Sequence, residues 1–351
     1  MNAIILNELF VNETKPSFFP RDHSDEVSFV RFSNNGKLLA TCSKDDCIHI
    51  YNVLPHGLQL NLRIKTDSMD PGFITFSPAD SMMICCSSVE QQSNLLLIRL
   101  KEKASSIEDT KASDNPNNIE SPRKLSHELL LALDSGISKK TFAFASFSPT
   151  GKHFVTGGIG GRFEYYSINS KEPLAHWAGV RVRGCSWLSD NRILVADNQN
   201  RVQLYHFKKI IDSRLSLSEG VENNGPEFLF KEEENILSMR CFKHKFNNRP
   251  ICFLSVKCRG IRLWDINSRS MVRSFSGLHQ INMIYDIALG GNESQFIAAG
   301  SEDKKISIWH INMELPVKVL EGHHGAVNSV DWFGNFMVSV SDDFSLRLWA
   351  P

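Results

Sequence analysis

Near the end of the sequence lie a histidine, a serine and an aspartate, the three side chains that together catalyse acyl transfer in serine hydrolases. They are His323, Ser339 and Asp343. A nucleophilic serine must stand exposed on a sharp turn between a strand and a helix, where its hydroxyl can reach a substrate. Ser339 lies instead in the middle of the run from Met337 to Ser341, which is typical of a half-buried strand. We therefore expect these residues to stabilise the fold, and we predict no catalytic residue and no enzyme.

Two further patterns are similar to ligand sites but have the wrong context. The glycine-rich stretch 157–161 is similar to a phosphate-binding loop, but such a loop follows a strand and opens a helix. Here residues 162–166 alternate as another strand, so we predict a tight hairpin with positive φ angles. The 12 histidines include no HExxH motif and the cysteines form no CxxC pair, so we expect neither a metal site nor a cofactor.

One segment has the chemistry of a nucleic-acid contact. Residues 240–249 combine arginines and lysines with interleaved phenylalanines. Charged residues in a hairpin usually mark a solvated turn, and the chain has no matching basic stripe elsewhere. We therefore interpret the segment as a solvated surface, with an RNA contact through Lys243 and Lys245 as the alternative.

The composition disfavours several classes of protein. The 351 residues contain 39 Lys plus Arg and 39 Asp plus Glu, so no net charge would draw the chain to nucleic acid or to a membrane. The sequence has no apolar stretch of the length that a transmembrane helix needs and no signal-peptide pattern. Eight cysteines without disulfide spacing indicate reduced core thiols in a cytoplasmic or nuclear protein.

The elements that must position these residues are short strands that repeat. Apolar and polar residues alternate over short runs along the chain, and helix signals are scarce. Over residues 323–349 a histidine, an alternating strand, a serine strand, an aspartate turn and a tryptophan strand follow one another. The same order recurs over residues 23–51 and 284–309. Such self-similarity is the signature of a repeat architecture.

This order resembles a WD repeat, and the resemblance implies an all-β fold, a seven-bladed WD-repeat β-propeller. Each of seven units has a marker near the end of its third strand, and the markers are Tyr51, Ile98, Tyr166, Tyr205, Trp264, Trp309 and Trp349. The last three markers are spaced by about 40 to 45 residues, as expected for a four-stranded blade. We predict a single domain over residues 1–351.

The wider gaps between markers hold polar stretches, at about residues 101–124 and 208–226. Such stretches cannot bury enough apolar surface to order themselves, so we predict insertions between strands of the propeller and not domain boundaries. We expect the apolar patch 4–10 to supply the outer strand of the last blade, which would close the ring between the two ends of the chain.

The WD resemblance also implies a hydrogen-bonded tetrad in the last unit, composed of His323, Ser339, Asp343 and Trp349. A buried indole N–H needs an acceptor, a serine hydroxyl can provide it, and the histidine and aspartate complete a satisfied chain. The first unit keeps a partial set, composed of His23, Thr41, Asp45 and Tyr51. In the sixth unit Ala299 stands where the hydroxyl would be. We expect those two blades to be held mainly by apolar packing.

Three stretches are more specific than a general WD pattern. Residues 23–41, residues 177–190 and residues 296–317 resemble the family of WD-repeat-containing protein 26, the WD-repeat subunit of the GID/CTLH ubiquitin ligase complex. The resemblance implies a non-catalytic protein-interaction scaffold that recruits substrates or supports such a complex, with ligase subunits and substrates as its partners. Only 22 residues precede His23, so we expect the propeller alone, without the helical LisH and CTLH segments of that family.

The top rim around the central channel is the predicted protein-binding surface. In a propeller the residues that flank the start of each inner strand, and the residue before the turn aspartate, point toward this rim. These positions hold Arg181, Arg183, Tyr285, Glu26, Ser28, Lys44, Asn198, Glu302, Asn328 and Asp342. Arginine and tyrosine are enriched at interface hot spots, so Arg181, Arg183 and Tyr285 are the strongest candidates. The alternative for the two arginines is an ion pair with a neighbouring carboxylate such as Asp197.

A second function stays open at the level of the sequence. A free-standing WD-repeat adaptor associated with RNA or ribonucleoprotein would use segment 240–249. Neither alternative includes a membrane, and we expect any oligomer to form only through a complex.

Overall fold

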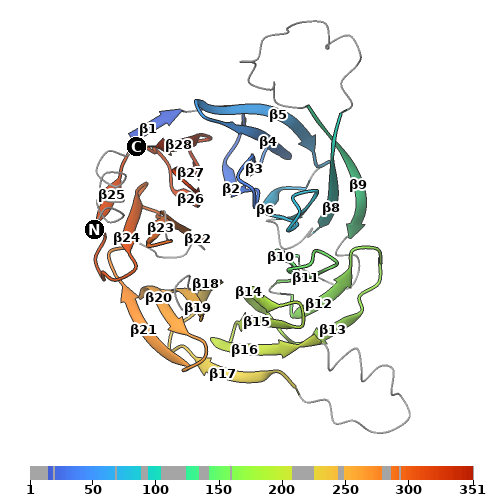
Figure 1. The fold of residues 1–351 in the computed structure, drawn as a ribbon, viewed down its shortest axis with the longest axis vertical. Helices are drawn as coiled ribbons and strands as arrows, with labels where there is room; N and C mark the ends of the chain where they lie inside the picture. Colours follow the sequence, from blue (N-terminus) through green and yellow to red (C-terminus); the bar gives the residue numbers. More distant parts are fainter. Residues whose placement is uncertain are drawn as a thin grey trace, which may run out of the picture.

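Seven antiparallel four-stranded sheets stand around a common centre like the blades of a propeller (Figure 1). The computed structural model describes residues 15–18, 20–67, 69–87, 94–103, 124–133, 142–158, 160–207, 225–243, 249–278, 286–291 and 294–350. The predicted seven-bladed β-propeller is therefore confirmed. Within these residues no helix is long and apolar enough to cross a membrane.

Six blades are each built from four consecutive strands, and the first of the four lies nearest the centre (Figure 1). Blade 1 comprises β2 (Val27–Phe32), β3 (Leu38–Ser43), β4 (Cys47–Leu54) and β5 (Gly57–Lys65). Blade 2 comprises β6 (Pro71–Phe76), β7 (Met82–Ser87), β8 (Leu95–Glu102) and β9 (Leu125–Leu133). Blade 3 comprises β10 (Phe144–Phe147), β11 (His153–Gly157), β12 (Arg162–Ser167) and β13 (Ala175–Ala178).

The next three blades repeat this order. Blade 4 comprises β14 (Val182–Ser189), β15 (Arg192–Asp197), β16 (Arg201–His206) and β17 (Glu227–Lys231). Blade 5 comprises β18 (Ile236–Lys243), β19 (Pro250–Val256), β20 (Gly260–Asp265) and β21 (Ser270–Phe275). Blade 6 comprises β22 (Ile287–Gly290), β23 (Phe296–Gly300), β24 (Ile306–His310) and β25 (Lys318–Leu320).

The seventh blade takes its strands from both ends of the chain. Its three inner strands are β26 (Val327–Phe333), β27 (Phe336–Ser341) and β28 (Leu346–Ala350), and its outermost strand is β1 (Lys15–Phe18). β1 runs antiparallel to β28, with Lys15 opposite Ala350. The N-terminal part of the chain therefore closes the ring (Figure 1).

The prediction that residues 4–10 supply this outer strand is wrong, because β1 begins at Lys15 and residues 4–10 lie outside the described residues. The spacing of the repeat explains the difference. The outer strand of blade 6 ends at Leu320, shortly before His323 opens the next unit, and β1 likewise ends shortly before His23. The position of the outer strand therefore follows the repeat and not the most apolar stretch.

The seven markers all lie in the third strand of their blades, from Tyr51 in β4 to Trp349 in β28. The alternation of apolar and polar residues predicted half-buried strands, and for the second strands this is wrong. β23 is buried at every position, and β27, which contains Ser339, is buried at every position after its first. A second strand is covered on both faces because each blade lies between two neighbours.

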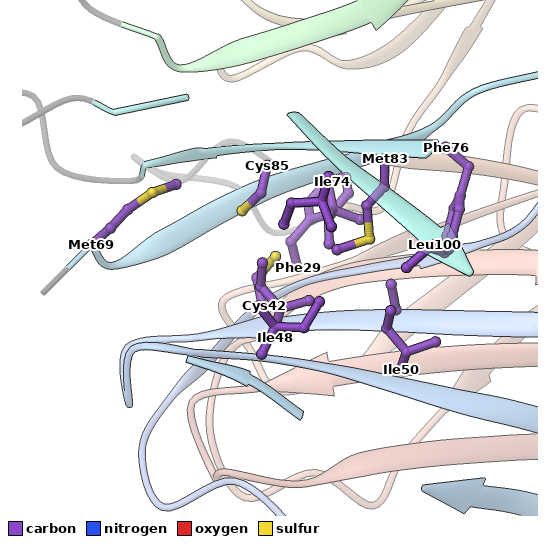
Figure 2. Packing of buried hydrophobic residues seen from close by; sticks show 13 residues of the cluster. Phe29, Cys42, Ile48, Ile50, Met69, Ile74, Phe76, Met83, Cys85 and Leu100 are labelled. Carbon is purple, nitrogen blue, oxygen red and sulfur yellow. The ribbon is translucent and has the colours of Figure 1, made fainter. Parts of the chain in front are cut away.

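The apolar cores lie between blades and not within them. Seven clusters of buried residues each combine side chains of two consecutive blades. Figure 2 shows the cluster between blades 1 and 2, where Cys42 and Ile48 of blade 1 approach Ile74 and Cys85 of blade 2. Loss of any one blade would expose two of these clusters to water, which is unfavourable in proportion to the apolar area.

Two loop predictions concern blades 2, 3 and 4. The glycine stretch 157–161 joins β11 to β12 as an antiparallel hairpin, with Gly161 at φ 76, so the hairpin prediction is confirmed. Most of the two predicted insertions lies outside the described residues. The strands that flank them pair with each other, β8 with β9 and β16 with β17.

A chain of hydrogen bonds lies inside blade 7. The indole N–H of Trp349 donates to Ser339 Oγ at 2.8 Å, and Ser339 Oγ lies 2.7 Å from His323 Nε2. His323 Nδ1 lies 3.0 Å from Asp343 Oδ2. Because an ionised carboxylate can only accept, Nδ1 carries the proton of the neutral imidazole, and Nε2 accepts from the serine hydroxyl, which itself accepts from the indole of Trp349. Ser339 is fully buried, so no substrate reaches it.

Two titratable groups in this chain have shifted pKa values. Burial lowers the pKa of His323, although its hydrogen bond with Asp343 acts in the opposite direction. Burial by itself would raise the pKa of Asp343, but hydrogen bonds from His323, Ser345 and the backbone N–H of His324 hold it well below its usual range. The folded protein therefore contains a neutral histidine beside an ionised carboxylate.

Blade 1 has hydrogen bonds within its partial set in addition to the apolar clusters that it shares with blades 2 and 7. His23 Nδ1 lies 2.9 Å from Asp45 Oδ2, and His23 Nε2 lies 2.8 Å from Thr41 Oγ1. The ring of His23 stacks on His49 with 3.8 Å between the ring centroids. The hydroxyl of Thr41 thus binds the histidine of blade 1 as the hydroxyl of Ser339 binds the histidine of blade 7.

Blade 6 satisfies its buried tryptophan in a different way. Ala299 cannot accept a hydrogen bond from the indole, and Trp309 Nε1 donates instead to the backbone oxygen of Ser276 at 2.8 Å. Ser276 lies in the connection between β21 and β22, so this bond ties blade 6 to the chain that leaves blade 5.

The substitution Ser339→Ala should destabilise the fold by about 2 kcal/mol, because it leaves a buried indole N–H and a buried imidazole nitrogen without partners. Urea unfolding followed by tryptophan fluorescence measures the change. The control Ser268→Ala removes an exposed hydroxyl in the turn after β20 and should change the stability by less than about 0.5 kcal/mol. Equal losses in the two variants would contradict a structural role for the blade 7 chain.

Acid should destabilise the protein, in part through His49. Burial, and then the charge of His23, lower the pKa of His49 from 6.5 to about 3. Between these two values the unfolded chain binds one more proton at this site than the folded chain, so stability falls as the pH falls below 6.5. From pH 7 to pH 5 the variant His49→Gln should therefore lose about 2 kcal/mol less than the unaltered protein.

Urea unfolding at the two pH values tests this prediction. The control His176→Gln replaces an exposed histidine and should leave the pH dependence unchanged. A loss between pH 7 and pH 5 that is the same in His49→Gln and in the unaltered protein would show that His49 does not contribute.

Candidate functional site

Those predicted rim residues that the structure describes lie on one face of the ring, the face at which the inner strands begin, and we call it the top face. The same backbone hydrogen bond brings them together in several blades. The N–H of Lys44 donates to the oxygen of Glu26 at 3.0 Å in blade 1, and that of Asn198 donates to the oxygen of Arg181 at 2.9 Å in blade 4. The N–H of Asp342 donates to the oxygen of Ala326 at 3.0 Å in blade 7.

A β-bulge marks the second residue of the inner strand in five blades. The bulge residues are Ser28, Gly72, Arg183, Leu237 and Asn328. A bulge places two residues opposite one and turns a side chain away from its regular direction. Ser28 Oγ donates to the oxygen of Pro71 at 2.7 Å, and Asn328 Nδ2 donates to the oxygen of Val27 at 2.9 Å. These two bulge residues therefore join their blades to the next blade at the channel mouth.

Several predicted rim residues are engaged with each other. Lys44 forms an ion pair with Glu26, and their hydrogen bond raises the pKa of the Lys44 ammonium. Asn328 Nδ2 also donates to Asp342 Oδ1 at 2.6 Å. Asn198 is exposed and Glu302 is half-buried, whereas Tyr285 lies outside the described residues.

Arg181 and Arg183 differ from the other rim residues. The expected alternative partner, Asp197, is buried and binds Arg201, with 2.7 Å between Asp197 Oδ2 and Arg201 Nη2. Within the described residues no carboxylate lies within 4.0 Å of either guanidinium. Arg181 is exposed and Arg183 is half-buried at the channel mouth. Both side chains lie on the face that is predicted to bind partners.

One structural position recurs on the inner strand of every blade. In each blade the marker on the third strand pairs with one residue of the second strand. The next residue of the second strand pairs in turn with a residue of the inner strand. The inner-strand residues found in this way are Arg31, Thr75, Ser146, Ser186, Arg240, Ala288 and Asp331, and we call them the channel ring.

The charged members of the channel ring form a cluster across blades 5, 6, 7 and 1. Arg31 binds Asp286, which precedes β22, and lies 3.5 Å from Asp331. Arg240 lies 3.4 Å from Asp331 and 3.7 Å from Asp286, and it donates to the oxygen of Ile287 at 2.7 Å. Asp331 Oδ2 also accepts the backbone N–H of Phe32 at 2.8 Å.

The two arginines and two aspartates balance each other. Burial by itself would raise the pKa of Asp286, but Arg31 and Arg240 lower it, so the carboxylate is charged. The arginines also stand over rings, with Arg31 4.9 Å from the ring centroid of Phe29. The cluster therefore ties four consecutive blades together through the channel.

The interpretation of segment 240–249 as a solvated turn is wrong for Arg240. This residue lies in β18, and its side chain binds Asp286 and Asp331 in the channel. Residues 244–248 and the side chain of Lys243 lie outside the described residues. Sequence reasoning also missed Arg31, Asp286 and Asp331. A signal was available, since Arg31 and Asp331 hold the same position in their units and each has apolar neighbours on both sides in the sequence, but nothing local says that the two side chains meet.

The remaining polar members of the channel ring are the hydroxyl residues Thr75, Ser146 and Ser186 of blades 2, 3 and 4. They line a cavity of about 630 Å³ together with Arg183, Phe73 and Phe144. No group of three or more metal-ligating side chains that could hold an ion occurs among the described residues. The hydroxyl groups and arginines that line the cavity can form hydrogen bonds and recognise charge.

Comparison with known proteins agrees with this architecture. The model of the family WD40 (WD domain, G-beta repeat) matches residues 14–52, 271–310 and 314–350. Over 334 residues, 93% of this chain and 46% of that protein, the chain is 32% identical to a WD repeat-containing protein 26 homolog of Drosophila melanogaster.

Two plant proteins are also similar. A WD repeat-containing protein WDS homolog of Arabidopsis thaliana is 25% identical over 94% of this chain and 56% of that protein. A WD repeat-containing protein 26 homolog of the same plant is 26% identical over 93% of this chain and 49% of that protein. The chain spans about half the length of the curated relatives that it matches.

The substitution Asp331→Asn should destabilise the propeller by about 3 kcal/mol, because it leaves two arginines in the channel with one carboxylate. Asparagine keeps the shape of the side chain and an oxygen that can accept the Phe32 N–H. Urea unfolding measures the change.

The control is Glu234→Gln, which removes the carboxylate of an exposed pair with Arg259 at 3.9 Å. It should cost less than about 0.5 kcal/mol. A loss for Asp331→Asn as small as that of the control would contradict the view that the channel cluster holds blades 5, 6, 7 and 1 together.

Proposed function

Because the chain is a WD-repeat protein that is homologous over its propeller to WD repeat-containing protein 26, we propose that it is a non-catalytic scaffold in a GID/CTLH-type ubiquitin ligase complex. Its role there is to recruit substrates or to support the structure of the complex. The partners are other ligase subunits and substrate proteins, in the cytoplasm or the nucleus.

The observation that carries this proposal is the similarity to the Drosophila protein over 93% of the chain, far beyond the three segments that the general repeat model matches. The site supports binding and not catalysis. Ser339, His323 and Asp343 are enclosed in blade 7, whereas Arg181 and Arg183 offer charges on the top face. Arginine on an exposed rim is a side chain that protein interfaces favour.

The alternative of an RNA-associated adaptor loses part of its support. Arg240 was one of the cations in the basic segment, and its guanidinium is held by Asp331 and the oxygen of Ile287. A continuous basic surface is what non-specific RNA binding requires. We therefore keep the ligase scaffold as the proposed function.

Purification of the tagged chain from its source cells, followed by mass spectrometry, tests the proposal. Subunits of a ubiquitin ligase should be recovered with the unaltered protein. If no ligase subunit is recovered under mild salt conditions, the proposed membership of the complex is wrong.

The double substitution of Arg181→Glu and Arg183→Glu tests the binding face. It should lower the recovery of top-face partners by about tenfold or more, because charge reversal at an interface hot spot removes attraction and adds repulsion. The control Arg192→Glu reverses a charge at the opposite face of the same blade, at the first residue of β15, and should retain all partners. Equal recovery in both variants would exclude the top face of blade 4.

A further inference from the structure

The channel of this propeller has two unlike halves. In blades 5, 6, 7 and 1 the side chains of Arg31, Arg240, Asp286 and Asp331 meet and neutralise one another. In blades 2, 3 and 4 the channel ring carries only the short side chains of Thr75, Ser146 and Ser186, which do not extend across the centre. The cavity of about 630 Å³ is lined by these three side chains and also by Arg31, Arg240 and Asp286 of the charged half.

The three hydroxyls of this half are arranged for an outside partner. They occupy the same position on three consecutive inner strands, β6, β10 and β14, and all three line the cavity. Within the part of the chain that the structure describes, none of these hydroxyls makes a hydrogen bond. Polar groups that face a partly enclosed space favour a ligand that completes their hydrogen bonds.

The charged side chains that line the cavity indicate the charge of its ligand. Four charged side chains line the cavity, Arg31, Arg183, Arg240 and Asp286. Asp286 and Asp331 offset Arg31 and Arg240, so the charge that remains is that of Arg183. The bulge in β14 places Arg183 at the channel mouth, above Ser186 on the same strand. An anionic group that enters from the top face meets a guanidinium first and hydroxyl donors below it.

The shape and the lining favour a peptide. A volume of about 630 Å³ lies in the range of pockets that enclose small ligands and short chain segments. Phe73 and Phe144 stand beside the hydroxyls and can contact the carbon atoms of a peptide. A nucleic-acid strand needs several unpaired cations along a groove, whereas one unpaired arginine suits a single carboxylate.

We propose that the channel binds an acidic peptide segment of a partner protein, inserted from the top face, with a carboxylate held by Arg183 and by the hydroxyls of Thr75, Ser146 and Ser186. This inference deepens the proposed function, since it rests on the top face being the surface that receives partners. It names the chemistry that such a partner must carry.

A fluorescein-labelled hexaglutamate peptide is the probe, and fluorescence anisotropy with the purified full chain is the measurement. The unaltered protein should bind hexaglutamate, and it should bind hexaglutamine at least about tenfold more weakly, because a charged acceptor forms the stronger hydrogen bonds. Binding should weaken as salt is raised, because salt screens the attraction to the guanidinium. A hexapeptide of alternating serine and phosphoserine shows whether a phosphate replaces the carboxylate.

Two variants separate insertion into the channel from contact with the rim. Arg183→Gln removes the charge, and the triple variant Thr75→Val, Ser146→Ala and Ser186→Ala removes the hydroxyls while every surface charge stays in place. Both should bind hexaglutamate about tenfold or more weakly. The control Arg192→Gln removes a charge at the opposite face of blade 4 and should bind as the unaltered protein does. Thermal unfolding of each variant confirms that the propeller is intact.

Each other outcome overturns the inference. If Arg183→Gln weakens binding but the triple variant does not, the peptide lies on the rim and not in the channel. If a folded unaltered protein does not bind hexaglutamate, or binds hexaglutamine equally well, the channel has no preference for an acidic peptide. Neither result affects the proposed scaffold role, which depends on the recovery of ligase subunits.

Discussion

The pairing of β1 with β28 closes the ring, and the rest of the structure depends on this closure. The apolar cores lie between blades, so every blade needs two neighbours to bury both of its faces. An open ring would leave the cores on either side of the gap in water and would expose a strand edge that could pair with another chain. Closure by a strand from the opposite end of the chain makes the first and last units neighbours. The fold therefore has no weakly attached end blade, and its stability is shared around the ring.

The unit that repeats in the sequence is not the blade. The three matched segments, 14–52, 271–310 and 314–350, each begin in or before the outer strand of one blade and run into the third strand of the next. Each repeat thus contributes to two blades and carries the connection between them. The recurring order of histidine, hydroxyl, aspartate and aromatic acts at this connection, since His23 and His323 lie just before the inner strands and bind side chains of the second strand and its turn. Where the hydroxyl is replaced, as at Ala299, the indole of Trp309 finds an acceptor in the connection itself.

Equivalent positions in a repeated frame can carry different chemistry. The channel ring offers one place per blade at the same depth, and it holds two arginines, an aspartate, three hydroxyl residues and an alanine. The charged half ties blades together, whereas the hydroxyl half carries only short side chains, and both halves line the cavity beside Arg183. If all seven positions held the same charged residue, the channel could not neutralise their charges. If all seven held short side chains, these would not join the blades across the channel. The asymmetry between units, and not the repeat, is what gives this propeller a site.

The sequence by itself determined the number of blades, the strand that carries each marker and the hairpin at residues 157–161, because these follow from local periodicity and from turn chemistry. It did not locate the closing strand, since the apolar patch at 4–10 was a stronger local signal than the spacing that places β1. Only the tertiary structure decided that Arg240 lies in the channel beside Asp331, 91 residues away, and that Asp197 binds Arg201 and not the rim arginines. Only it showed that bulges turn Ser28 and Asn328 toward the next blade. The physical reason is that a repeat specifies contacts within a unit, whereas the channel and its mouth are formed by residues that no periodicity relates until the ring has closed.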